Sequence, residues 1–336
     1  MADLAAAARR VAAAFAPEAG AAEPFGGGHI NDTFVVATPG GDLVVQRLNP
    51  AVFPDPEAVT ANIVLLHRRL PCTGLLPEPV RAADGRWLLH DESGAWRAWR
   101  RVPGAAPVPG PTPAAVTAAA RLLGRFHRSV AALDPAAFAE TLPGFHDPAR
   151  RLARLRDVVA ADPCRRAAGV TDELARAEEA APLATLAADL TTRVPRRVAH
   201  YDAKLDNVLF RGDEAVCLVD LDTVMPGAWF WDVGDLLRSA ATTAAEDEPD
   251  PSLVAVDPVL YDAALAGYAA GLGGDTATPA EQEAVRSAGA IVTYEQAVRF
   301  LTDWIAGDVY YRVTRPAQNL DRARAQFRLL ASMPRP

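Results

Sequence analysis

Short runs of alternating apolar and polar residues occupy the first hundred positions of the chain. Two such runs that are rich in β-branched residues and joined by a tight turn predict a β-hairpin. Two hairpins are therefore expected, TFVVAT (33–38) with DLVVQRL (42–48) and GRWLLHD (85–91) with AWRAWRRV (95–102). Helices are expected at 3–16 and at about 56–70.

From residue 113 onward the pattern changes to helices. Thr112-Pro113 begins one helix that is predicted to run to about residue 131. Thr278-Pro279-Ala280-Glu281 begins another, with an N-cap threonine, a proline at the first helical position and a capping-box glutamate. Only two short strands are expected in this second half, NVLF (207–210) and VCLVD (216–220).

A proline-rich segment, VPGAAPVPGPTP (102–113), separates the two patterns and marks the predicted boundary. We therefore expect an α+β, bilobal fold. Its small β-rich lobe would span residues 1–102, and its larger, mainly helical lobe residues 103–336. A chain of 336 residues is long enough for two lobes, since domains average about 150 residues.

Composition narrows the classes of function. The net charge is −8, so no basic excess exists to neutralise a nucleic-acid backbone. No apolar run approaches the length of about 18 residues that spans a bilayer, and we expect no membrane partner. Cys72, Cys164 and Cys217 are far apart and form no CxxC pair. This spacing excludes a disulfide framework or a cysteine–zinc site and fits a cytoplasmic location.

The basic residues are unusually biased, because Lys204 is the only lysine beside 33 arginines. The rigid fork of arginine and the compact charge of lysine do different work. The one lysine therefore marks a position where arginine does not serve.

The segment VAHYDAKLDNVLF (198–210) gathers polar side chains in a short loop before a predicted strand: His200, Asp202, Lys204 and Asn207. The next strand ends in Asp220-Leu221-Asp222. This layout is typical of phosphoryl transfer, which needs a carboxylate to deprotonate the acceptor hydroxyl and oxygen ligands for magnesium on the nucleotide phosphates. The alternative is a solvated turn between two strands, and the complete set at this spacing argues against it. His200 is expected to brace the loop.

HYDAKLDN followed by VDLD resembles the H-x-D-x-x-x-x-N and D-x-D motifs of the kinase-like small-molecule phosphotransferases, which include aminoglycoside and choline kinases. Within that superfamily, several segments look like the N-acetylhexosamine 1-kinase group: GGGHINDTFVV (26–36), VVQRLNPAVF (44–53), LPGFHDPARRL (142–152), VDLDTVMPG (219–227) and TDWIAGDVYYRVTRPAQNLDRAR (302–324). The resemblance runs from about residue 23 to residue 330. It implies a protein-kinase-like fold that binds ATP and Mg²⁺ between its lobes.

By this resemblance Asp202 is the catalytic base, and Asn207 and Asp220 are magnesium ligands. Asp222 would contact the second metal or the sugar. Lys204 occupies a place where such kinases often direct a lysine toward the γ-phosphate, which agrees with the argument from composition.

The front lobe supplies the candidate nucleotide contacts. The glycines Gly26, Gly27 and Gly28 let backbone N–H groups approach phosphates, unless they form a plain hairpin turn. Arg47 stands where this fold usually has a phosphate-pairing lysine, and its carboxylate partner is expected from the 56–70 helix, whose only acid is Glu57. The remaining candidates are Arg101 and Val102, as the hinge that bonds the adenine edge.

Arg299, Tyr310 and Tyr311 match the sugar-contacting end of the resembling family. Aromatic faces suit the apolar faces of sugars, and arginine suits hydroxyl or acetamido oxygens. The alternative for the two tyrosines is packing between helices. Tyr201 departs from the Gly or Asn common in the family, and its ring is expected to shape the acceptor pocket.

The sequence thus predicts a kinase that uses ATP and Mg²⁺ to phosphorylate a free sugar at the anomeric hydroxyl, an N-acetylhexosamine or a related hexose. One alternative is a phosphotransferase for a cationic acceptor such as an aminoglycoside or choline. Another is a nucleotide-binding pseudokinase, against which the intact Asp202, Asn207 and Asp220 argue. We expect a monomer or weak dimer without nucleic-acid partners.

Overall fold

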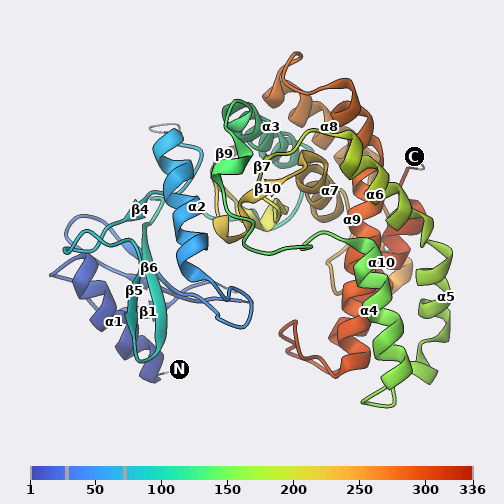
Figure 1. Ribbon diagram of the computed structural model, residues 1–336, viewed down its shortest axis with the longest axis horizontal. Coiled ribbons are helices and arrows are strands. Elements are labelled where there is room, and N and C mark those ends of the chain that lie inside the picture. The colour runs from blue at the N-terminus through green and yellow to red at the C-terminus, as the bar shows by residue number, and fades with distance from the viewer. Residues whose placement is uncertain (1, 27–29, 71–73, 335–336) are drawn as a thin grey trace.

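The computed structural model describes residues 2–26, 30–70 and 74–334 (Figure 1). Its N-terminal part is an antiparallel sheet in the order β1-β2-β3-β6-β4, and β5 pairs with β6. The strands are β1 (Ala22–Pro24), β2 (Asp32–Val36), β3 (Leu43–Arg47), β4 (Pro79–Val80), β5 (Leu89–Asp91) and β6 (Gly94–Arg100).

The two faces of this sheet bury different side chains. Helix α1 (Ala2–Phe15) covers one face, where Val11 packs in one cluster with Phe34 and Trp96. Helix α2 (Pro56–Arg69) lies between the sheet and the rest of the chain (Figure 1). Its Ile63 belongs to the main core together with Trp99 of β6. A side chain on the sheet face opposite α1 therefore points toward the C-terminal region.

The C-terminal part is mainly helical: α3 (Pro113–Val130), α4 (Pro148–Ala161), α5 (Thr171–Glu179), α6 (Pro182–Arg193), α7 (Trp229–Ala240), α8 (Pro258–Leu272), α9 (Pro279–Ala306) and α10 (Gln318–Ser332). Two short antiparallel pairs interrupt it, β7 (Arg197–Ala199) with β10 (Met225–Gly227) and β8 (Val208–Arg211) with β9 (Glu214–Leu218). Among the described residues, no helix has both the length and the apolar composition to cross a membrane.

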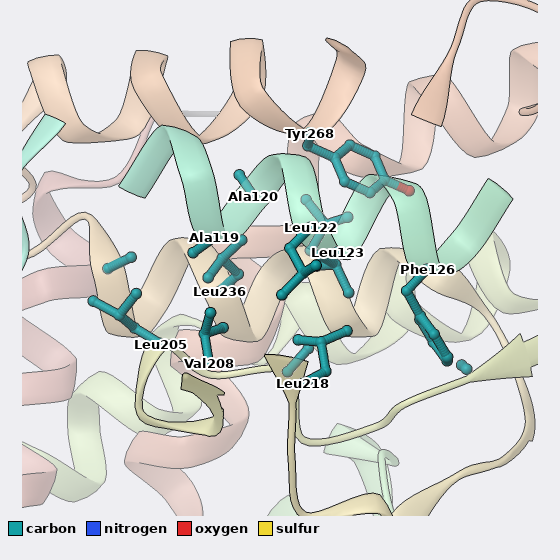
Figure 2. Close-up of a cluster of buried hydrophobic side chains, with 14 of the residues drawn as sticks. Ala119, Ala120, Leu122, Leu123, Phe126, Leu205, Val208, Leu218, Leu236 and Tyr268 are labelled. Carbon is teal, nitrogen blue, oxygen red and sulfur yellow. The ribbon is translucent and has the colours of Figure 1, made fainter. Parts of the chain in front are cut away.

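Helix α3 anchors the loop that carries the predicted catalytic residues. Figure 2 shows its Leu122, Leu123 and Phe126 above Leu205, which lies in that loop, and Leu218, which ends β9. On its other side α3 packs against α8 at very close range. A Cβ atom added at Gly271 would lie 2.1 Å from the carbonyl oxygen of Arg121, so only glycine permits this contact.

The α+β fold with a β-sheet region followed by a helical region is confirmed. The first predicted hairpin is present, whereas in the second one β5 covers only the last three residues of 85–91. The strands β7 and β10 were not predicted. Ala106 in the proline-rich segment bridges to Phe210. A boundary between residues 102 and 103 stays a prediction.

Candidate active site

The loop that follows β7 is held by one buried carboxylate. Asp232, at the start of α7, accepts hydrogen bonds from the backbone N–H groups of His200 (2.7 Å) and Tyr201 (2.6 Å). It also pairs with Nε2 of His127 at 2.8 Å. Nε2 of His200 lies 3.0 Å from the carbonyl oxygen of Val219, which joins the loop to the end of β9. The expected bracing role of His200 agrees with these contacts.

The polar groups predicted from this loop are brought together. Nζ of Lys204 lies 3.1 Å from Oδ2 of Asp202, and Nδ2 of Asn207 donates to the same oxygen at 2.8 Å. Burial alone would raise the pKa of Asp202, but the charge of Lys204 and the hydrogen bonds from Lys204 and Asn207 hold the pKa below its ordinary value. Asp202 is therefore an ionised carboxylate, oriented by two donors and partly open to solvent.

Asp220 lies two residues after the end of β9, with its backbone in the left-handed region at φ 62°. Its side chain accepts no hydrogen bond from the residues that the structure describes. Loss of water around it and the negative charges of Asp222 and Asp202 raise its pKa to about 7. Nδ2 of Asn207 donates hydrogen bonds to Asp202, whereas Oδ1 of Asn207 has no hydrogen-bond partner within the described chain. Carboxylate and amide oxygens without donors, beside further carboxylates, are suited to a hard cation.

Asp222 is bound by the sheet region instead of facing open solvent. It is 1% exposed, accepts from Nδ2 of Asn31 at 2.6 Å and forms an ion pair with Arg97 of β6. Both carboxylate oxygens thus already accept hydrogen bonds from protein side chains. A contact between Asp222 and a metal or a sugar stays a prediction, and the structure gives this residue a different role as a link between the two regions.

The structure overturns the placement predicted for Arg47. Its guanidinium group donates to Oδ2 of Asp32 (2.6 and 2.9 Å) and to the carbonyl oxygen of Ser93 (2.9 Å). In the sheet Arg47 is paired with Trp96, whose side chain belongs to the face covered by α1. Glu57, the expected partner, contacts His90 at 2.8 Å. Arg47 therefore lies on the face turned away from Asp202.

The other predicted nucleotide contacts are only partly described. Gly26 has φ 76°, a conformation that favours glycine, whereas Gly27 and Gly28 lie outside the described residues. The backbone N–H of Arg101 donates to the carbonyl oxygen of Asp42. The N–H of Val102 has no partner in the described chain. Of the two, only Val102 therefore has a free backbone N–H group that could donate to the edge of an adenine ring. The hinge role of Arg101 and Val102 stays a prediction.

The guanidinium group of Arg299 lies close to the rings of Tyr310 and Tyr311. The guanidinium carbon of Arg299 lies 5.8 Å and 5.6 Å from the two tyrosine ring centres, and 5.3 Å from that of Phe145. Burial would lower the pKa of Arg299, but the tyrosines, Glu295 and Asp202 raise it above its ordinary value. The influence of Asp202 places this cluster within electrostatic reach of the predicted base.

Sequence reasoning missed the residues that hold this cluster in place. Oδ1 of Asp303 accepts from the backbone N–H groups of Val309 (2.9 Å) and Tyr310 (2.8 Å), and Oδ2 accepts from that of Tyr311 (2.9 Å). Glu295 is fully buried and bonded to His146 at 2.7 Å. The hydroxyl of Tyr311 is buried and unpaired among the described residues. The sequence offered one signal for this role, since the acidic residue Asp303 lies shortly before Tyr310 and Tyr311.

Tyr201 adjoins this cluster through Phe145, because the ring centres of Phe145 and Tyr201 lie 6.2 Å apart. Both rings form part of the wall of a cavity of about 460 Å³, between α6, the segment 140–148 and β10. Neither Asp202 nor Arg299 lines that cavity. The ring packs on Gly227, where an added Cβ atom would lie 1.9 Å from it. The structure thus places Tyr201 in the catalytic loop with its ring beside Phe145, and its expected role in shaping the acceptor pocket stays a prediction.

Comparison with known proteins identifies the family of this chain. Residues 21–274 match the model of the phosphotransferase enzyme family. The chain therefore belongs to the phosphotransferase enzyme family.

Solved structures share the fold over almost the whole chain. A microcompartment-associated aminopropanol kinase is 16% identical with a TM-score of 0.65, over 96% of this chain and 94% of that chain. An aminoglycoside phosphotransferase from Alicyclobacillus acidocaldarius is 16% identical with a TM-score of 0.63, over 96% and 93%. The choline kinase from Streptococcus pneumoniae is 13% identical with a TM-score of 0.60, over 98% and 99%. These similarities show the fold alone.

Proposed function

We propose that this phosphotransferase moves the γ-phosphoryl group of ATP to the anomeric hydroxyl of a free sugar, an N-acetylhexosamine or a related hexose. Asp202 accepts the proton of the attacking hydroxyl and is kept ionised by Lys204. Lys204 faces the phosphoryl group that is transferred and offsets its negative charge. Family membership and the contacts of Asp202 support this assignment, and the acceptor is the part that goes beyond them.

Asn207 and Asp220 fit a magnesium ion, because both present oxygen atoms without protein donors among the described residues. When bound, Mg²⁺ would neutralise charge on the nucleotide phosphates, and it commonly takes only one or two carboxylates from a protein. No group of three His, Cys, Asp or Glu side chains in the described part of the chain is arranged to hold a metal by itself. A magnesium ion that shares its ligands with the nucleotide and with water is consistent with that.

The observation that carries the sugar assignment is the Arg299 cluster. A cationic acceptor needs free carboxylates near the base. Asp220 is assigned to magnesium, and beside the Arg299 cluster Glu295 is already bonded to His146, and Asp303 to backbone N–H groups. What remains available is a guanidinium group among three aromatic rings. Among the described residues, only its Nη1 donates to a protein acceptor, Oε1 of Gln296 at 2.7 Å. That combination suits a neutral sugar ring with hydroxyl or acetamido oxygens. The resemblance to the N-acetylhexosamine 1-kinase group points to the same acceptor.

A cationic acceptor is the second candidate, because the similar solved structures are named as aminopropanol, aminoglycoside and choline kinases. The test is a coupled assay of ADP release over free hexoses, N-acetylhexosamines, aminoglycosides and choline. We expect turnover with an N-acetylhexosamine or hexose and a sugar 1-phosphate by phosphorus NMR. A methyl glycoside, whose anomeric oxygen is blocked, should not react. Turnover with choline or an aminoglycoside alone would replace the sugar assignment, and no ADP release at all would favour the pseudokinase.

A further inference from the structure

Arg97 lies on the face of the sheet that looks toward the catalytic loop. In the sheet register, Arg97 of β6 pairs with Gln46 of β3, and Gln46 pairs with Thr33 of β2. Side chains alternate between the two faces of a strand, so these three residues share one face and Arg47 points to the other. The ion pair between Arg97 and Asp222 shows which region the first face meets.

The guanidinium group of Arg97 is held in a fixed orientation. Oε1 of Gln46 accepts from Nε at 3.3 Å and from Nη2 at 2.9 Å, and the same oxygen accepts from Nε1 of Trp99 at 2.7 Å. Nε2 of Gln46 donates to the hydroxyl of Thr33 at 3.2 Å, which fixes the amide. Nη2 of Arg97 also donates to Asp222. One edge of the fork is thus fully used by the protein.

The remaining nitrogen of the fork has no partner in the described chain. Nη1 of Arg97 is buried and donates to none of the described residues, although the whole residue is only 3% exposed. A buried charged N–H group without a partner is costly unless a ligand completes it. Asp222 lies two residues after Asp220, and the charge of Arg97 acts on Asp220 as well. The unpaired donor is therefore close to the carboxylate proposed to hold magnesium on the nucleotide.

We propose that Arg97 binds a phosphate oxygen of the bound nucleoside di- or triphosphate, the role that the sequence assigns to Arg47. This inference rests on the proposed function, because it needs a nucleotide between the two regions. The planar guanidinium group can bind both partners at once. Nε and Nη2 remain hydrogen-bonded to Gln46 and Asp222, while Nη1 donates to the phosphate oxygen. Gln46 is then a positioning residue for Arg97.

Calorimetric titration of adenosine and ADP, without magnesium, separates the base contacts from the phosphate contacts. Arg97→Met should weaken the binding of ADP by about 10- to 100-fold, the usual effect of losing a hydrogen bond to a charged group, and leave adenosine unchanged. Arg47→Met is the matched control, since it removes the same group from the opposite face. It should leave both affinities within about threefold, because the side-chain hydrogen bonds of Arg47 go only to Asp32 and Ser93 among the described residues.

Arg97→Gln is the second variant in case the methionine variant fails to fold, because a glutamine amide still donates to Asp222. The ratio of the ADP and adenosine affinities should fall in the same way. Unchanged ADP binding in a folded Arg97 variant, or equal losses for adenosine and ADP, would overturn the inference. Wild-type protein that binds neither adenosine nor ADP would overturn the proposed function itself, so the two failures are distinct.

Discussion

Asp232 is the residue whose loss should disturb the catalytic loop most. It is fully buried and accepts from the backbone N–H groups of His200 and Tyr201 and from His127. Asp232→Asn keeps the size but turns one acceptor oxygen into an NH₂ group, which must then face an N–H donor. One backbone N–H group then loses its hydrogen bond. The remaining hydrogen bonds become weaker, because their acceptor no longer carries a negative charge.

A buried N–H group left without a partner costs about 1–3 kcal/mol. Hydrogen bonds to a charged acceptor are worth about 1.5–3 kcal/mol each, and the amide that replaces the carboxylate gives its donors only neutral hydrogen bonds. We therefore expect Asp232→Asn to lower the free energy of unfolding by about 3 kcal/mol. Since Tyr201 directly precedes Asp202, we also expect kcat to fall by about 10²-fold, as displacement by about 1 Å can do.

Urea unfolding can be followed by tryptophan fluorescence, because Trp229 stacks on His127 with ring centres 4.7 Å apart. Kinetics would come from the coupled ADP-release assay. Asp257→Asn is the control, because Asp257 caps α8 at the surface and asparagine caps helices equally well. If Asp232→Asn unfolds within about 1 kcal/mol of wild type, or retains kcat within about threefold, the central role of Asp232 is refuted.

Asp202→Asn should lower kcat by about 10²–10⁴-fold while ADP binding persists, and turnover within a few-fold of wild type would remove Asp202 as the base. Lys204→Arg should reduce kcat more than it changes KM, because a planar fork does not replace a point charge 3.1 Å from Asp202; full activity would contradict this. Burial lowers the pKa of His127 below its ordinary value of 6.5, so its contribution to stability is present above about pH 6.5 and declines as pH falls through the folded pKa. The loss of unfolding free energy on going from about pH 7.5 to about pH 5.5 should therefore be smaller in His127→Gln, and an equal loss would contradict this.

The polar groups within one loop were predictable from the sequence, because Asp202, Lys204 and Asn207 lie close together along the chain. Local spacing fixes such a cluster, and the structure brings these groups within hydrogen-bond distance. The same holds for the capping box at Thr278, which begins α9 as predicted.

Contacts that depend on strand register were not predictable. Arg47 and Arg97 are both arginines on sheet strands, and a shift of one position exchanges the two faces. Only the pairing of Gln46 with Arg97 shows which arginine meets Asp222. The strands β7 and β10 have three residues each and exist through pairing with distant chain, so no local run announces them. The role of Asp303 likewise depends on where α9 ends.

The single lysine gives this protein a built-in site for selective chemical modification. Lys204 is the one ε-amino group in the chain, and about 31% of its side chain is exposed. Burial would lower its pKa, but the charges of Asp202, Asp220 and Asp235 raise it above the ordinary value, which keeps the amine protonated and slow to acylate. The rate at which an amine-directed reagent labels this side chain therefore reports the charge on the neighbouring carboxylates. The arginine-rich chain offers such a reagent no competing lysine, and peptide mapping separates Lys204 from the N-terminal α-amino group, so a change at the catalytic loop can be followed without any introduced probe.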